Sequence, residues 1–176
     1  MMKYVLMAAA LAAPISGWAD CQIFASQQKV SWSKLSAAER QQAQGQAITL
    51  PEKQIQVQVV CTAPQRIRLF VSSDLAQNDT FALGPYGEMH IVASDAHVDD
   101  KSVRLAPVNG SEAISASGGS ETADVALNQT LAFMDGQEVA GKTASVTFTI
   151  KSKVQPGSIT EKTTWHGNLK IKMEAR

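Results

Sequence analysis

The stretch QIQVQVVCTAPQRIRLFVS, residues 54–72, carries the clearest structural pattern in the chain. Its first half alternates apolar residues with glutamines, and its second half places Ile67, Leu69 and Val71 on one face and Arg66, Arg68 and Ser72 on the other. Side chains alternate between the two faces of a strand, so this period of two indicates strands with one buried face. We predict two strands here, either a hairpin or two successive strands of a sandwich.

Shorter runs with the same character occur along the rest of the chain. The strand candidates are residues 80–83, 88–93, 102–106, 125–133, 145–151 and 168–176. Turn signals separate them, among them the acidic stretch 94–100 and a long polar loop over 109–124. One helical signal, a capping box over residues 36–39, predicts one or two helical turns. The pattern favours an all-β protein, an immunoglobulin-like β-sandwich whose topology it does not fix.

The N-terminus is typical of an exported protein. Lys3 precedes an apolar run over residues 5–15, and small residues stand before a cut after Ala19. This is the pattern of a cleaved signal peptide, and the run is shorter than the roughly 20 apolar residues that span a bilayer. We expect residues 1–19 to be removed and residues 20–176 to form a single exported domain without a membrane span.

Both cysteines, Cys21 and Cys61, fall within the expected mature chain. An even number of cysteines in an exported protein indicates a disulfide, and their spacing does not fit a CxxC redox or zinc motif. We predict one Cys21–Cys61 disulfide, which would stabilise the fold by roughly 4 kcal/mol in the chain-entropy model. The alternative is a pair of reduced, buried cysteines.

The balance of 16 basic and 16 acidic residues gives no electrostatic reason to expect nucleic acid or an anionic membrane as a partner. Asp95, His97, Asp99 and Asp100 form the most suggestive cluster, which could hold a divalent cation or be a solvated acidic turn. The turn is favoured, because no EF-hand or HExxH spacing is present. No nucleophile elbow occurs either. We therefore expect no enzyme, no catalytic residues, no metal site and no cofactor.

Three aromatic residues could form a surface that stacks on sugars: Trp32, Trp165 and Tyr86. The competing interpretation places the two tryptophans in or beside the core. A sugar-binding surface would fit a self-sufficient, exported, adhesin-like binding module that recognises glycans through a complete sandwich.

From Cys21 onward, the chain resembles subunits of bacterial fimbriae assembled by the chaperone–usher pathway, and in particular fimbrial-like exported proteins. Three features carry the resemblance. A cysteine opens the domain and is followed by Val30-Ser31-Trp32; the phrase Cys61-Thr62-Ala63-Pro64 runs directly into the next strand; and an alternating strand ends the chain.

The resemblance implies an immunoglobulin-like sandwich that lacks its final strand. A periplasmic chaperone lends a strand during folding, and the N-terminal extension of another fimbrial subunit replaces it after delivery to an outer-membrane usher. Carried over by position, Leu169, Ile171 and Met173 would line one side of a hydrophobic groove for that strand. The chaperone would also hold the carboxylate of Arg176. The expected location is the periplasm, then the cell surface or fimbrium.

The chain departs from that family in two places. Subunits that polymerise carry a donor segment of about a dozen residues before the first cysteine, whereas a cut after Ala19 leaves only Asp20 there. Ala175 also stands where many pilins have a penultimate tyrosine. The expected function is therefore that of a structural fimbrial subunit that accepts a strand, in a terminal position of a fibre or in a relative that does not polymerise.

Overall fold

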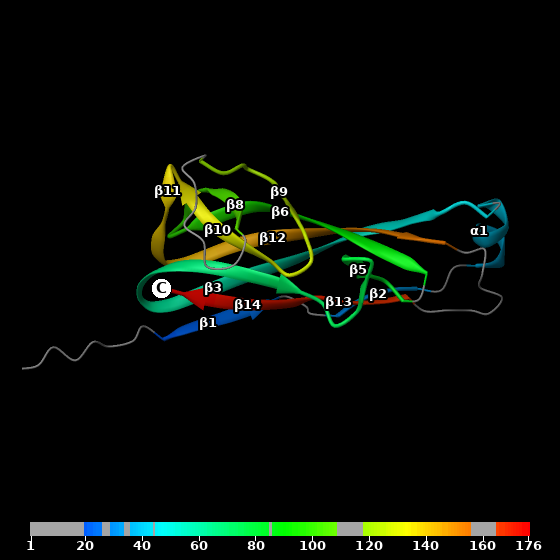
Figure 1. The fold of residues 1–176 in the computed structure, drawn as a ribbon, viewed down its shortest axis with the longest axis horizontal. Coiled ribbons are helices and arrows are strands. Elements are labelled where there is room, and N and C mark those ends of the chain that lie inside the picture. Colours follow the sequence, from blue (N-terminus) through cyan, green and yellow to red (C-terminus); the bar gives the residue numbers. More distant parts are fainter. Residues whose placement is uncertain are drawn as a thin grey trace, which may run out of the picture.

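The computed structural model describes residues 20–25, 29–33, 36–43, 45–84, 86–108, 118–155 and 165–176. The predicted signal peptide and most of the predicted polar loop lie outside the described residues. The described chain is an all-β sandwich in which every strand pairing is antiparallel. Figure 1 shows an elongated body built from long, curled strands.

The first sheet has four principal strands in the order β1, β3, β12 and β6. Their bounds are Cys21–Ala25 for β1, Ile48–Ser72 for β3, Ala140–Val154 for β12 and Gly87–Val98 for β6. Short strands complete the far edge along β6, namely β4 (Ala76–Gln77), β5 (Thr80–Ala82), β7 (Lys101–Ser102) and β9 (Ala123–Val125).

Strand β3 belongs to both sheets because it bends sharply in its middle. Val60 pairs with Thr143 of β12, but Gln65 pairs with Gly141, so β3 advances by five residues while β12 advances by two. In Figure 1 the β3 ribbon curls back on itself at the end of the molecule that also carries the C-terminus. The two runs predicted over residues 54–72 are thus successive sandwich strands joined by a continuous, bent β3.

The second half of β3 is the centre of the second sheet. On one side it pairs with β14, and on the other with β10, which pairs in turn with β8 and β11. The bounds are Lys170–Ala175 for β14, Gln129–Asp135 for β10, Arg104–Val108 for β8 and Gln137–Glu138 for β11. A separate two-stranded sheet joins β2 (Lys29–Trp32) to β13 (Trp165–Asn168).

The helix α1 (Ala37–Gln42) confirms the predicted capping box. The Ser36 hydroxyl accepts from the Glu39 amide, and the Glu39 carboxylate accepts from the Ser36 amide. This reciprocal pair satisfies two backbone donors at the helix start and holds the pKa of Glu39 below its usual value. Among the described residues, no helix is long and apolar enough to cross a membrane.

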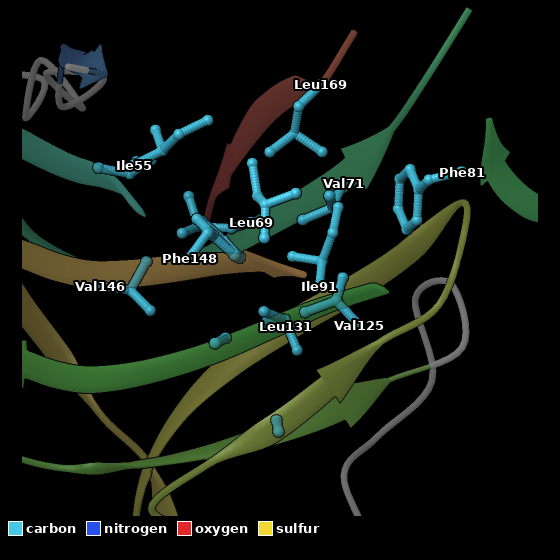
Figure 2. Packing of buried hydrophobic residues seen from close by; sticks show 14 of the residues in the cluster. Ile55, Leu69, Val71, Phe81, Ile91, Val125, Leu131, Val146, Phe148 and Leu169 are labelled. Atoms are coloured by element: carbon cyan, nitrogen blue, oxygen red, sulfur yellow. The ribbon is translucent and has the colours of Figure 1, made fainter. Parts of the chain in front are cut away.

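The core lies between the two sheets. Ile55, Val146, Phe148 and Ile91 of the first sheet point toward Leu69, Val71 and Leu131 of the second, as Figure 2 shows. Each of these side chains is buried. The period-two alternation read from residues 54–72 therefore gives the correct inward face of β3 in both sheets.

Several predicted strands differ in length from the observed ones. The strand expected over 88–93 continues to Val98, so the predicted acidic turn is confined to Asp99 and Asp100, which both have positive φ. The register with β12 shifts at a bulge at Asp95. This bulge breaks the alternation of buried and exposed residues, so the sequence pattern did not predict that β6 continues past residue 93. The strand expected over 125–133 begins later, because Asn128 adopts a positive φ in a turn.

Candidate functional site

Strand β1 is fixed firmly to the first sheet at its start. Cys21 lies directly opposite Cys61 in the register with β3, and the two form a disulfide with a Cα–Cα distance of 4.0 Å. The Thr62 amide donates to the Asp20 carbonyl at 2.9 Å and extends the pairing by one residue. The predicted disulfide is confirmed, and it joins two directly opposite residues on neighbouring strands.

Beyond β1 the N-terminal part of the chain changes its partner. Strand β2 pairs with β13 and not with β3, and Trp32 stands opposite Trp165. Both indole rings are buried, and the Trp32 Nε1 group donates to the Pro51 carbonyl at 2.8 Å. The interpretation that places these tryptophans in the core is thus confirmed. They leave Tyr86 as the exposed member of the proposed sugar-stacking trio.

The backbone of β14 has one occupied edge and one open edge. The Arg176 amide donates to the Arg66 carbonyl at 3.0 Å, and the Arg66 amide donates back at 2.8 Å. Doubly bonded pairs alternate with pairs whose backbone groups point away from the partner. Continuing the register from Arg176 therefore turns alternate residues outward, and these are Ile171, Met173 and Ala175. Among the described strands, none pairs with that edge.

The side chains predicted to form the apolar face of β14 have unequal surroundings. Leu169, in the break between β13 and β14, is fully buried in the closed core. Ile171 and Met173 pack against the same core but are only half-buried. Arg176 is exposed at the end of the strand. Ile171 and Met173 therefore lie along the open edge of β14. Leu169 precedes this edge and is buried in the core.

Strand β1 offers a matching edge. The hydrogen bond between Thr62 and Asp20 marks residues 20 and 62 as a bonded pair, so Cys21, Ile23 and Ala25 turn their backbone groups away from β3. The same three residues have half-buried side chains that pack against the core. Within the described residues, β1 pairs with β3 alone.

The two edges, residues 21–25 of β1 and 170–175 of β14, are here called the open edges. They lie alongside each other, with some Cα atoms within 8 Å, but no ladder joins them. Figure 1 shows the start of β1 at the same end of the molecule as the C-terminus. The ladder between β2 and β13 therefore does not continue between β1 and β14, which each pair only with β3 among the described strands.

An ion pair lies on the outer face of the second sheet, beside β14. Arg68 binds Glu138 in a bidentate arrangement, with Nε to Oε1 at 2.7 Å and Nη2 to Oε2 at 2.9 Å. The side chain of Arg68 is only 5% exposed. The expectation that Arg68 lies on a polar, solvent-facing side is wrong, because β11 brings Glu138 across the sheet to cover it.

The ion pair also perturbs both pKa values. The hydrogen bonds from Arg68, with smaller Coulombic attraction, hold the pKa of Glu138 below its usual value despite partial burial. The same hydrogen bonds raise the pKa of Arg68. Arg68 stands opposite Glu174 of β14 in the register, so the pair fixes the strand against which β14 packs.

Of the acidic cluster, Asp99 and Asp100 form a structural turn, whereas Asp95 and His97 lie in β6. The Asp99 carboxylate accepts from the amides of Lys142 and Thr143, both at 2.9 Å, and from the Thr143 hydroxyl at 3.2 Å. These bonds hold the pKa of Asp99 below its usual value and tie the β6–β7 turn to β12. Among the described residues, no group of three or more His, Cys, Asp or Glu side chains is placed to hold a metal ion.

The sequence pattern predicted the β14 side of the open edges but not the β1 side. Ile23 and Ala25 belong there, and they alternate with Gln22 and Phe24, which are exposed. The alternation is present in the sequence, but five residues are too few to stand out beside longer runs.

One known protein matches the chain along most of its length. The chain is 32% identical over 163 residues to the protein of Escherichia coli (strain K12) named as the uncharacterized protein YhcE, and the match covers 90% of each chain. This chain belongs to the YhcE family. No protein-family model and no solved structure matches it. The name of the relative states no activity, ligand or partner.

Proposed function

We propose that this protein is a fimbrial-like structural subunit that accepts a β-strand from another protein at its open edges. The donated strand would lie between β1 and β14 and hydrogen bond to the outward-turned backbone of both. Because a strand needs about 4.8 Å on each side, β1 and β14 would move apart where their Cα atoms lie within 8 Å. During folding the donor would be a periplasmic chaperone, which would also hold the exposed Arg176 carboxylate. Later it would be a neighbouring fimbrial subunit, after passage through an outer-membrane usher.

One observation carries the proposal. On both open edges, most residues whose backbone groups point outward also have half-buried apolar side chains: Ile23 and Ala25 on β1, and Ile171 and Met173 on β14, whereas Ala175 at the end of β14 is exposed. Unpaired strand edges are templates for β-augmentation, in which main-chain hydrogen bonds give affinity and alternate side chains give specificity. A strand with apolar residues at every second position would complete the burial of all four.

The cut expected after Ala19 bears on whether the protein could also donate a strand. With only Asp20 before Cys21, the exported chain would accept a strand without offering one. It would then occupy a terminal position in a fibre or remain unpolymerised at the cell surface or in the periplasm. Mass spectrometry of the protein exported to the periplasm would establish the N-terminal residue and test this element by itself.

The acceptor role can be tested by fusing a donor strand to the C-terminus of residues 20–176 through a flexible linker. The donor would be a dodecapeptide that alternates valine or leucine with threonine, and the matched control would carry the same residues in an order without alternation. The expected result is a monomeric alternating fusion whose Tm exceeds that of the control by roughly 10 °C, because several apolar side chains become buried.

Two outcomes of this experiment would contradict the proposal. One is equal Tm values for the alternating and control fusions. The other is an unfused chain that is monomeric and already as stable as the alternating fusion, since its edges would then need no partner. Expressing the unfused chain with a cognate periplasmic chaperone gives a second readout, in which we expect a higher yield and a stable one-to-one complex.

A further inference from the structure

A shallow groove lies on the outer face of the first sheet, away from the core. It has a volume of about 720 Å³, and its lining includes Phe24 of β1, Gln58 of β3, Ser145 of β12 and His97 of β6. Asp95 stands at the β6 side. These residues belong to the four principal strands, so the groove runs across the sheet and not along one strand.

The strand register aligns the groove residues in a row. Phe24 is opposite Gln58, Gln58 is opposite Ser145, and Ser145 is opposite His97. Neighbouring strands are about 4.8 Å apart, so this row across four strands is about 14 Å long. An aromatic ring, an amide, a hydroxyl and an imidazole are thus presented in a line on a rigid sheet.

The exposure of these side chains makes them reachable. Phe24 is 53% exposed, so its ring is open to solvent on the outer face of the sheet. Gln58 and Asp95 are exposed on the walls, while Ser145 and His97 are half-buried. Within the described residues, the side chains of Gln58 and Ser145 make no hydrogen bond, so their donors and acceptors are free for a ligand.

The bulge in β6 shapes the end of the groove. Asp95 has a positive φ of 51°, a conformation that costs energy for a non-glycine residue, at the point where the register between β6 and β12 shifts. The His97 Nδ1 atom lies 3.0 Å from the Asp95 carbonyl oxygen, which orients the imidazole and leaves Nε2 unused by this contact. Bulges commonly re-aim side chains in this way.

We propose that this groove binds a short, neutral oligosaccharide. Its lining, as described, holds amides, hydroxyls, an imidazole and one carboxylate, but no lysine or arginine. Hydroxyl-rich ligands need groups that both donate and accept, which amides and hydroxyls supply. An exposed aromatic ring offers an apolar face for the C–H side of a sugar ring. The absence of cationic side chains from this lining disfavours sulfated glycans and nucleic acids.

The inference does not rest on the strand-accepting role. The row of Phe24, Gln58, Ser145 and His97 lies on the face opposite the core, whereas the open edge of β1 involves its inward-facing residues; Ala25 alone belongs to both the groove lining and that edge. The two proposals can therefore fail separately. Binding to the groove should be the same for the unfused chain and for the donor-strand fusion, provided that both are folded.

The test is a titration of the ¹⁵N-labelled chain, residues 20–176, followed by NMR. The probes are chitotriose, maltotriose and cellotriose, with a sulfated heparin tetrasaccharide as the anionic comparison. We expect at least one neutral trisaccharide to shift the resonances of Gln58 and His97. We expect Phe24→Ala to weaken that binding roughly tenfold or more, which corresponds to the loss of one favourable ring contact.

Tyr86→Ala is the matched control, because Tyr86 is an aromatic residue that is 47% exposed but lies outside the groove. This variant should bind within roughly twofold of the unaltered chain. Gln58→Ala provides a second test in the middle of the row, and it should also weaken binding. Dispersed NMR spectra of each variant would show that it is folded.

Three outcomes would overturn the proposal. In the first, none of the neutral probes shifts the groove resonances at about 10 mM, a concentration about tenfold above a Kd of 1 mM. In the second, the heparin tetrasaccharide alone binds there. In the third, Phe24→Ala and Gln58→Ala both bind as well as Tyr86→Ala, which would place the binding elsewhere.

Discussion

The two halves of the terminal strand region, β13 and β14, have similar alternation but opposite surroundings. β13 is enclosed: β2 pairs with it through Trp32 and Trp165, and Leu83 forms a bridge to Gly167. β14 has β3 on one edge and, among the described strands, nothing on the other. Trp165, the apolar side chain of β13, is buried, whereas Ile171 and Met173 of β14 are only half-buried.

This difference indicates which part of the structure could pair with a strand from another molecule. The closed half, β13, is held by packing that any partner would have to disrupt. The open half, β14, has unpaired backbone groups that a further strand would hydrogen bond and apolar surface that it would cover. The N-terminal chain produces the contrast by switching from β3 to β13 between β1 and β2.

Removing the aromatic packing of the closed half should have the largest effect on stability. Trp165→Ala empties a fully enclosed site and should lower the free energy of unfolding by about 3–5 kcal/mol. Chemical denaturation followed by circular dichroism measures this. A loss below about 1 kcal/mol would show that β13 is not more tightly packed than β14.

Removing the disulfide should come next, because it alone ties the start of β1 covalently to β3. The double variant Cys21→Ser, Cys61→Ser should lose about 4 kcal/mol, the chain-entropy value for a separation of 40 residues. The same denaturation experiment, with the oxidised and chemically reduced native protein as controls, separates the bond from the substitutions. Equal stability of the oxidised and reduced protein would contradict this prediction.

The ion pair beside β14 should give a smaller and pH-dependent effect. Glu138→Gln weakens the charged hydrogen bonds to a nearly buried Arg68 and should cost about 2 kcal/mol at neutral pH. The folded-state pKa of Glu138 is lowered, so its contribution is present above the unfolded carboxyl pKa, near 4.5, and is lost as pH falls through the folded-state pKa.

Stability curves of the unaltered chain and Glu138→Gln between neutral and acidic pH test this sign. The two curves should be apart at neutral pH and should converge as the pH falls. Curves that stay parallel down to the acid limit would show that the Glu138 charge contributes nothing, and Glu121→Gln, which alters an exposed carboxylate, serves as the matched control.

A substitution on the open half should have the smallest effect on the free chain. Met173→Thr removes apolar surface that is only half-buried, so we expect a loss of about 1 kcal/mol or less. In the alternating donor-strand fusion the same change should cost more, because the side chain is then covered. Equal costs in both contexts, measured by thermal unfolding, would argue against a strand between β1 and β14.

Sequence patterns predicted the inward faces of β3, the disulfide, the capping box and the terminal strand, because each depends on local periodicity or on a simple count. They did not predict the burial of Arg68, since its partner Glu138 lies 70 residues away and arrives through the topology. They also missed the change of partner between β1 and β2. Both halves of that segment alternate, and only the three-dimensional packing decides which strand each half meets.

Hydrogen exchange of the backbone amides of β14, measured by NMR, shows whether the outer edge of this strand is open. In the free chain, the Ile171, Met173 and Ala175 amides should exchange quickly, while the Lys172 and Glu174 amides, which face β3, should be protected. All five should be protected in the alternating donor-strand fusion. Uniform protection of these amides in the free chain would show that the edge is already paired, which would contradict the proposal that β14 accepts a strand from another protein.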